Sequence, residues 1–249
     1  MKKLKIVIVV GTRPEIIRLS SIIKRLSNSK FINYKLIHTG QNYDKNLNEV
    51  FFKDLGIPKP NFFLNAAKKS SAVTIGEILI KIDPILDKIN PDAMLILGDT
   101  NSCMSAISAK KKKIPIFHYE AGNRCFDFRV PEETNRILVD HLSDINLTYS
   151  SNASSNLVKE GLPLDRVIKI GSPIYEVLQD NLTKINKSKI IERLNIEKQK
   201  YFLVSSHREE NIDSEINFKK LVSSLNKIAE LYNLPIVFPI HPRTKKQII

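Results

Sequence analysis

The sequence predicts an α/β protein built on parallel β-sheets, and two features of its pattern support this prediction. Short apolar runs alternate with segments of helical periodicity along the 249 residues. Six of these runs lead directly into polar segments, which hold four of the five histidines. Strands that alternate with helices form a parallel sheet with right-handed crossovers, so their carboxyl ends meet at one edge, where ligands bind. We therefore expect an active site at that edge.

The first half of the chain contains the clearest strand and helix patterns. Leu4–Val10 is followed by Gly11-Thr12-Arg13-Pro14-Glu15, Tyr34–Ile37 by His38 and further polar residues, and Met94–Leu97 by Gly98 and Asp99. Further strands are expected near residues 114, 144 and 167. Between the second and third of these runs, apolar residues at helical spacing predict an amphipathic helix: Ile75, Ile78, Leu79, Ile82, Ile85 and Leu86.

The segment from His118 to Arg136 follows the apolar run at residues 114–117 and is the most informative part of the chain. It holds four acids, three arginines and a histidine, mixed with apolar residues that can anchor a loop. Pro131 fits the first turn of a helix, and Glu132 and Glu133 then lie near the positive end of that helix. The alternative is an N-capped surface helix with a polar lead-in.

The domain organisation expected from these runs has two unequal parts. Residues 1–172 form an N-terminal Rossmann-like domain, and residues 173–200 read as a helical linker. Residues 201–249 begin a second sheet with a helix at Phe218–Leu231 and a strand at Ile236–Ile240. Because one strand–helix–strand unit cannot bury two sheet faces, we expect this second domain to be incomplete.

Composition limits the function classes. The net charge of +13 and the pI near 9.6 raise the question of nucleic-acid binding. The lysines are scattered over predicted helix surfaces, however, and no basic-and-aromatic stacking motif accompanies them, so we expect no nucleic-acid partner. No apolar stretch approaches the roughly 18 residues of a membrane span. Cys103 and Cys125 lack metal-ligand spacing, and in a cytoplasmic α/β protein we expect them to be reduced thiols. The basic charge balance also suits an anionic small substrate such as a nucleotide diphosphate.

Five motifs occur in one order along the chain. They are Gly11-Thr12-Arg13-Pro14-Glu15, Gly98-Asp99-Thr100, His118-Tyr119-Glu120-Ala121-Gly122, Pro131-Glu132-Glu133-Thr134-Asn135-Arg136 and His207-Arg208-Glu209. Together they resemble the non-hydrolysing UDP-N-acetylglucosamine 2-epimerases over essentially the whole chain. The resemblance implies a glycosyltransferase-B-like fold, with the substrate between two Rossmann-like domains. The UDP-holding Ser-Gly-Gly loop of the family is absent from these residues.

The chemistry that this resemblance implies is inversion at C2 of a UDP-2-acetamido sugar. Loss of UDP from C1 gives an unsaturated glycal, and readdition of UDP completes the turnover. Such a reaction needs a base, an acid and cations for the leaving diphosphate, but no cofactor and no metal. Family members are commonly homodimers. The residues from Glu120 to Glu133 resemble most the branch that forms UDP-N-acetyl-L-fucosamine from UDP-2-acetamido-2,6-dideoxy-L-talose.

The resemblance assigns roles to individual residues of this chain. Asp99, Glu120 and Glu132 match the catalytic carboxylates, and His207 matches a residue that assists departure of UDP. Three arginines match positions near the nucleotide: Arg13, Arg18 and Arg136. Three further residues match parts of an activator site found in some bacterial relatives: Gln41, Arg208 and His241.

Each carboxylate also has a simpler interpretation. Asp99 could cap the helix that follows it, Glu120 could pair with Arg124, and Glu132 could serve only the helix dipole. Arg18 could lie on a solvated helix face. Two other function classes stay open, namely a glycosyltransferase of the same fold and a non-catalytic binding fragment. If the second domain is incomplete, we expect the 249 residues alone to be nearly inactive.

Overall fold

The computed structural model describes residues 2–41, 51–205 and 214–239. The chain divides into two compact units, Met1–Asn181 and Leu182–Ile249, which are described separately. The predicted linker at residues 173–200 begins near the end of the first unit, in α7 (Ile174–Asn186), and stops before the first strand of the second.

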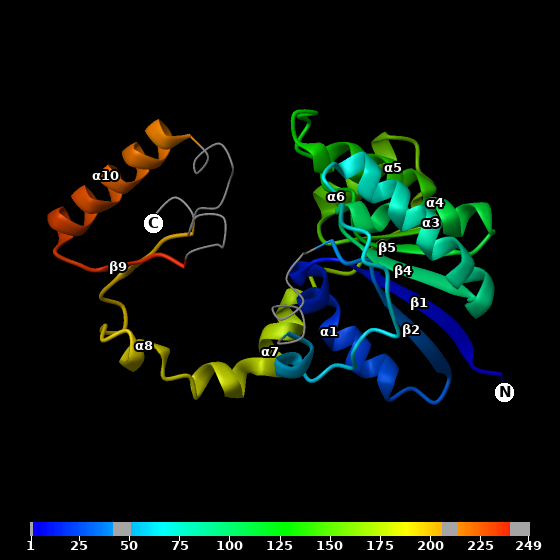
Figure 1. Ribbon diagram of the computed structural model, residues 1–249, viewed down its shortest axis with the longest axis horizontal. Coiled ribbons are helices and arrows are strands. Elements are labelled where there is room, and N and C mark those ends of the chain that lie inside the picture. The colour runs from blue at the N-terminus through cyan, green and yellow to red at the C-terminus, as the bar shows by residue number, and fades with distance from the viewer. Residues whose placement is uncertain (1, 42–50, 206–213, 240–249) are drawn as a thin grey trace. The chain divides into compact units, whose positions relative to one another are not determined.

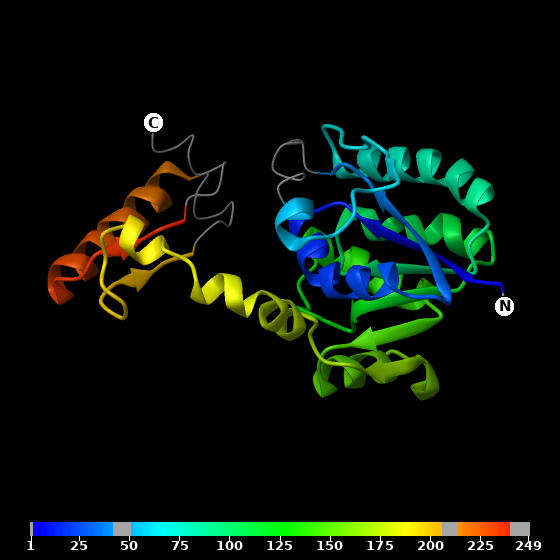
Figure 2. The same ribbon diagram turned by 90° about the horizontal axis from the view of Figure 1, so that it is seen from below.

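The first unit contains a seven-stranded sheet whose paired strands all run parallel, in the order β3-β2-β1-β4-β5-β6-β7. In Figure 2 the strands run from the blue β1 and β2 to the yellow-green β7. The strand bounds are β1 (Leu4–Val10), β2 (Ile32–His38), β3 (Phe62–Phe63), β4 (Ala93–Leu97), β5 (Ile116–Ala121), β6 (Ile145–Thr148) and β7 (Val167–Lys169). The parallel α/β prediction is confirmed, and β3 is the one strand of this sheet that the sequence pattern did not indicate.

Helices cover both faces of this sheet (Figure 1). On one face, α1 (Arg13–Ser27) packs Ile16, Leu19 and Ile23 against Ile8 and other strand residues. On the other face lie α3 (Ser71–Ile89), η1 (Asn101–Ser105), α4 (Ala106–Lys111) and α5 (Pro131–Leu142). A smaller core joins α6 (Ser151–Lys159) to β7, and η2 (Leu164–Arg166) precedes that strand. Burial of both faces explains why the strands read as continuous apolar runs.

The predicted helices start and end where local chemistry favours it. In α3, Ile78, Ile82 and Leu86 are buried, as their spacing predicted. The Ser70 side chain caps the start of this helix by accepting a hydrogen bond from the Val73 amide, and Asn90 ends it in the left-handed conformation. Pro131 occupies the first turn of α5, which confirms the predicted helix start.

The strand order places a topological switch point between β1 and β4. From β1 the chain goes to β2 on one side of the sheet, and after β3 it returns to β4 on the other side. The loops after these two strands therefore part at their carboxyl ends and leave room for a ligand, as in other open α/β sheets. The Gly11–Glu15 and Gly98–Thr100 motifs follow β1 and β4 directly.

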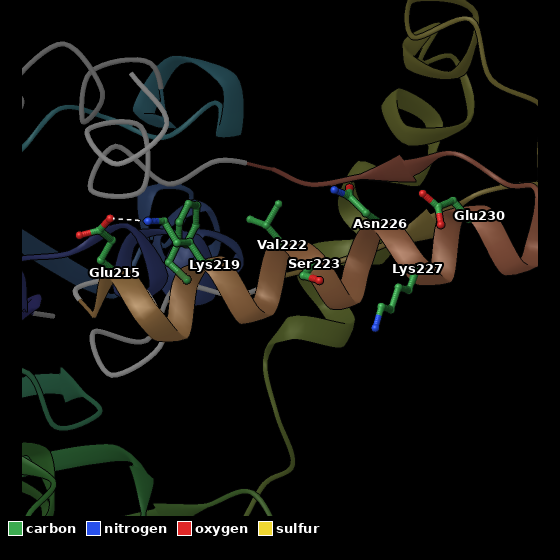
Figure 3. A pocket seen from close by; sticks show the side chains of 8 residues that line it. Glu215, Lys219, Val222, Ser223, Asn226, Lys227 and Glu230 are labelled. Carbon is green, nitrogen blue, oxygen red and sulfur yellow. Dashed lines mark hydrogen bonds and ion pairs between the residues drawn. The ribbon is translucent and has the colours of Figure 1, made fainter.

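The second unit contains a two-stranded parallel sheet, β8 (Phe202–Leu203) and β9 (Ile236–Val237), with α8 (Ile190–Arg193) and α10 (Glu215–Tyr232). No side chain in its described part is buried. A shallow pocket lies along α10 and is lined by residues of that one helix: Glu215, Phe218, Lys219, Val222, Ser223, Asn226, Lys227 and Glu230 (Figure 3). A pair between Lys219 and Glu215 at 2.6 Å lies at one end of it, and none of the predicted site residues lines it.

Within the described residues, no helix combines the length and the apolar character that crossing a membrane would need.

Candidate active site

Glu120 lies at the carboxyl end of β5 in an unusual backbone conformation. Its φ of 67° is in the left-handed region, which costs a residue with a Cβ on the order of 1–3 kcal/mol. The pairing of β5 with β6 shifts register between Tyr119 and Ala121, so the strand is irregular at Glu120. Non-glycine residues persist in this conformation only where the surrounding structure fixes them, and such positions cluster at functional sites.

The Glu120 carboxylate pairs with Arg18 of α1. Because α1 follows β1, this pair links the two sides of the switch point between β1 and β4. The Glu120 side chain is 18% exposed and that of Arg18 is 35% exposed. Burial raises the pKa of Glu120 above its usual value, and the negative charge of Asp99 adds to the effect, while Arg18 opposes it. A carboxyl group with a raised pKa beside a second acid suits general acid–base work.

Asp99 lies in the neighbouring loop after β4 and is held by Arg136 of α5. One carboxylate oxygen, Oδ2, accepts from Nε at 3.0 Å and from Nη2 at 2.6 Å. The Asp99 carbonyl accepts from the Asn135 side chain at 2.9 Å, which also fixes the loop. The helical cap here is Thr100, whose hydroxyl accepts from the Ser102 amide, so the interpretation of Asp99 as a helix cap is wrong.

Two adjacent acids at the start of α5 have opposite environments. Glu132 is exposed and makes no hydrogen bond or ion pair within the described part of the chain. Glu133 is buried, accepts from the amides of Cys125 and Phe126, and pairs with Arg136 at 2.6 Å. Burial alone raises the pKa of Glu133, but these amides and Arg136 outweigh it and hold the pKa below the usual value. Glu133 therefore holds the loop at Cys125 and Phe126 in place by hydrogen bonds, whereas Glu132 faces solvent.

Arg124 does not pair with Glu120, so that alternative is also wrong. Its guanidinium instead joins Asp140 at 2.7 Å and Glu160 at 2.6 and 2.7 Å. Both the Arg124 and the Asp140 side chains are almost completely buried. The Arg124–Asp140 pair is therefore shielded from solvent, unlike the Arg18–Glu120 pair.

The turn after β1 is organised by Glu15, a residue to which the sequence motifs assigned no role. Its buried carboxylate accepts from the Gly11 amide at 2.5 Å, the Thr12 amide at 2.8 Å and the Thr100 hydroxyl at 2.5 Å. It thus ties the loop after β1 to the loop after β4. Burial raises the pKa of Glu15 to about 7, against the opposing effect of these hydrogen bonds.

This arrangement affects how the turn at Arg13 can hold an anion. A turn from a strand into a helix can offer backbone amides to an anion, but here the amides of Gly11 and Thr12 donate to Glu15, and Pro14 has no amide hydrogen. The Arg13 guanidinium lies 5.9 Å from the centre of the Phe51 ring, close enough for a cation–π contact. An anion at this turn could not use the amides of Gly11 and Thr12 while they are bonded to Glu15.

Gln41 lies beside the same turn. Its side-chain oxygen accepts from the Ser102 hydroxyl at 3.3 Å, and Ser102 also bonds Thr39 at 2.8 Å. Gln41 is thus within the network that joins the loops after β2 and β4.

The sequence matches the profile of the UDP-N-acetylglucosamine 2-epimerases over residues 24–249. A protein of this name from Methanococcus maripaludis is 41% identical over 249 residues, which cover 98% of this chain and 67% of that protein. The solved UDP-N-acetylglucosamine 2-epimerase from Rickettsia bellii is 49% identical with a TM-score of 0.89, covering 99% of this chain and 64% of that one. The Methanocaldococcus jannaschii enzyme, solved in complex with UDP-GlcNAc and UDP, is 38% identical with a TM-score of 0.89, covering 98% and 68%.

The chain belongs to the UDP-N-acetylglucosamine 2-epimerase family. The family consists of isomerases, and the predicted family fold is confirmed by these structural matches. The chain spans about two thirds of the length of the relatives it matches.

Of the epimerase motifs, the first four lie in the first unit and gather at its carboxyl edge. His207, Arg208 and His241 lie outside the described residues. The described residues also contain no group of three histidine, cysteine or acidic side chains that could hold a metal ion.

Two histidines of the first unit, His38 and His141, are held by neighbouring side chains or backbone groups. His38 is buried, its Nδ1 accepts from the Gly40 amide at 2.9 Å, and its ring stacks on Phe63. Burial lowers the pKa of His38 to about 4. His141 lies at the surface, 3.2 Å from Glu160. His38 thus supports the loop that follows β2.

One polar group near the site was not suggested by any motif. The Tyr149 hydroxyl, just after β6, is buried and has no hydrogen-bond partner among the described residues. Burial and then the charge of Glu120 raise its pKa. No sequence signal distinguishes this tyrosine from one that only fills a core.

Proposed function

We propose that this protein inverts C2 of a UDP-2-acetamido sugar by eliminating UDP and adding it back. The observation that supports the proposal most strongly is that Asp99 and Glu120 lie near each other at the carboxyl edge of the sheet, beside the switch point, each paired with an arginine. Family membership supports the same reaction class. The UDP-GlcNAc and UDP bound to the Methanocaldococcus jannaschii relative are ligands of that type.

The proposed reaction assigns proton transfers to the carboxyl groups. One removes the proton from C2 and another delivers a proton to the opposite face, with Asp99, Glu120 and Glu132 as the groups involved. The raised pKa of Glu120 suits the acid. Arg13, Arg18 and Arg136 stabilise the charge that develops on the departing diphosphate, and His207 assists its departure.

Substrate binding would have to change the present ion pairs. Arg18 and Arg136 pair with Glu120 and Asp99, so a diphosphate that takes over these cations would remove the positive charge nearest to each carboxylate. The carboxylates would then become stronger bases at the moment when the substrate arrives. In this proposal Arg18 and Arg136 pair with Glu120 and Asp99 before substrate binds, and with the diphosphate afterwards.

The experiment that tests the proposal is turnover in deuterated water, using the protein expressed from its full gene. We expect one solvent deuteron at C2 of the product, without added nicotinamide cofactor or metal. Retention of the original hydrogen at C2 would exclude elimination and readdition. A requirement for a sugar acceptor would instead indicate a glycosyltransferase, and the absence of any turnover would favour a non-catalytic binding protein.

The sugar is the finer part of the proposal. The residues from Glu120 to Glu133 favour UDP-2-acetamido-2,6-dideoxy-L-talose, which would be converted to UDP-N-acetyl-L-fucosamine for a bacterial surface polysaccharide. Comparing kcat/KM for this sugar and for UDP-N-acetylglucosamine tests the sugar assignment, because a preference for the latter would contradict the branch assignment.

We further propose a cytoplasmic homodimer, which light scattering and cell fractionation can test. Gln41, Arg208 and His241 are the proposed activator contacts.

A further inference from the structure

Glu120 needs an explanation for its strained backbone. A φ of 67° costs a residue with a Cβ on the order of 1–3 kcal/mol, so contacts from the surrounding structure must hold Glu120 in this conformation. The two neighbours that matter are His118, two residues before it, and Gly122, two residues after it. Both are bonded to the carboxylate of Asp140 in α5.

His118 is fixed at both ring nitrogens. Its Nδ1 lies 2.8 Å from Oδ1 of Asp140, and its Nε2 donates to the Gly98 carbonyl at 2.8 Å. Gly98 immediately precedes Asp99, so the same ring connects the strand carrying Glu120 to the loop carrying Asp99. The ring is buried and cannot exchange these partners for water.

Gly122 is held as firmly on the other side. Its amide lies 3.3 and 3.1 Å from the two Asp140 oxygens, and its carbonyl accepts from the Asn156 side chain at 3.0 Å. A Cβ at this position would lie 2.3 Å from the Ala153 carbonyl oxygen, so only glycine allows this approach.

The Asp140 carboxylate is itself held in place by an ion pair with Arg124. It is fully buried, and Arg124 pairs with it at 2.7 Å while also forming two bonds to Glu160. A carboxylate bonded to this many groups is held in one orientation. It therefore fixes the positions of His118 and Gly122, which flank Glu120.

We infer that Asp140 is a positioning residue. By hydrogen bonding to His118 and Gly122, which flank Glu120 in the chain, it holds the Glu120 carboxylate in place. Within the described residues no hydrogen bond joins Asp140 to Glu120, so Asp140 acts through these two neighbours. The inference rests on the proposed function for its catalytic consequence, although the backbone geometry can be tested without any turnover.

The test compares Asp140→Asn with Asp144→Asn. Asp144 also holds β5, but at its opposite end, where it accepts from the Ile116 amide at 2.9 Å and from Lys110 at 2.7 Å. Asp140→Asn is expected to lower kcat about 100-fold with KM changed by no more than about twofold, as for a misplaced catalytic group. Asp144→Asn is expected to lower the melting temperature but leave kcat unchanged.

A second measurement uses the 249-residue chain and needs no activity. The Cα and Cβ chemical shifts of Glu120, assigned in ¹³C-glutamate-labelled protein by comparison with Glu120→Gln, report its left-handed conformation. We expect them to move in Asp140→Asn and to stay in Asp144→Asn. If the protein proves not to be an epimerase, this measurement still decides whether Asp140 positions Glu120.

A third variant covers poor folding of Asp140→Asn. In His118→Gln the side-chain amide can reach Asp140 or Gly98 but not both, so a smaller shift of the same Glu120 signals is expected. Unchanged Glu120 signals in folded Asp140→Asn, or equal loss of kcat in the Asp144 control, would overturn the inference.

Discussion

Acidic side chains at the carboxyl edge of the seven-stranded sheet lie in two layers. The buried layer consists of Glu15, Glu133 and Asp140, which are at most 2% exposed and accept hydrogen bonds from backbone amides. The outer layer consists of Asp99, Glu120 and Glu132, which retain contact with solvent. Within the described residues, no backbone amide donates to a side chain of this outer layer.

The difference between the layers separates support from chemistry. A buried carboxylate bound to several fixed donors has no capacity left for a ligand, and moving it would leave amides without partners. An outer carboxylate that accepts hydrogen bonds from side chains alone can exchange such a partner for a substrate. Substitutions in each layer test this separation.

The first prediction concerns the outer layer. Glu120→Gln and Glu132→Gln should each lower epimerisation by roughly 100- to 10,000-fold, because each removes an acid or base group. Steady-state kinetics of the protein expressed from its full gene measures the loss. Melting temperatures close to that of the native protein would show that the fold is intact. Near-normal turnover in either variant would remove that residue from the catalytic set.

The second prediction concerns the buried layer and uses the acid next in sequence. Glu133→Gln should lower the free energy of unfolding of the first unit by about 3–5 kcal/mol, because it leaves Arg136 and two amides partly unsatisfied. Urea titration measures the change, with Glu132→Gln as the matched control that should unfold like the native protein. Equal stabilities of the two variants would show that the layers do not differ as described.

Much of the fold followed from the sequence because the strands are apolar and regularly spaced. The expected strands near residues 4, 34, 94, 114, 144 and 167 are β1, β2, β4, β5, β6 and β7. The β3 strand was missed because two residues, Phe62 and Phe63, are too few to show any period. Asp99, Glu120, Arg18 and Arg136 gather at one edge, as strand ends in a parallel sheet must.

The buried acids could not be found in the same way. Hydrophobic periodicity gives no reason to bury a charge, and the partners that stabilise Asp140 come from residues far along the chain. Nor does the sequence decide whether Glu132 or Glu133 faces inward. Glu15 is the exception, since Thr12 and Glu15 have the spacing of a helix capping box, a signal available in the sequence.

The third prediction concerns pH and two buried groups with opposite effects. Glu15 has a folded pKa of about 7, above its usual 4.5, so its contribution to stability is complete below pH 4.5 and is lost as pH rises to about 7. His38 has a folded pKa of about 4, below its usual 6.5, so its contribution is complete above pH 6.5 and is lost as pH falls to about 4. Each effect corresponds to about 3 kcal/mol.

Between about pH 4.5 and 6.5, the changes in stability with pH that are due to Glu15 and to His38 offset each other in the native protein. Glu15→Gln should therefore lose stability as the pH falls through this range, and His38→Phe should lose stability as the pH rises through it. Urea titrations at a series of pH values measure both slopes. Parallel stability curves for the native protein and the two variants would contradict the assignment of these groups.

The smallest expected effect tests how tightly the buried layer is packed around Gly11. A Cβ at Gly11 would lie 1.9 Å from the Ser102 hydroxyl oxygen and 2.2 Å from that of Thr39, which bond each other at 2.8 Å. Gly11→Ala must push these hydroxyls apart and disturb the amide that donates to Glu15, which should cost about 1–3 kcal/mol. Gly76→Ala is the control, because a Cβ there meets no atom within 4 Å and alanine favours the helix. Thermal unfolding should show a lower melting temperature for Gly11→Ala and an equal or higher one for Gly76→Ala. If Gly11→Ala were as stable as the native protein, the loops after β1 and β4 would be loosely joined, and Glu15 could not be the group that fixes them.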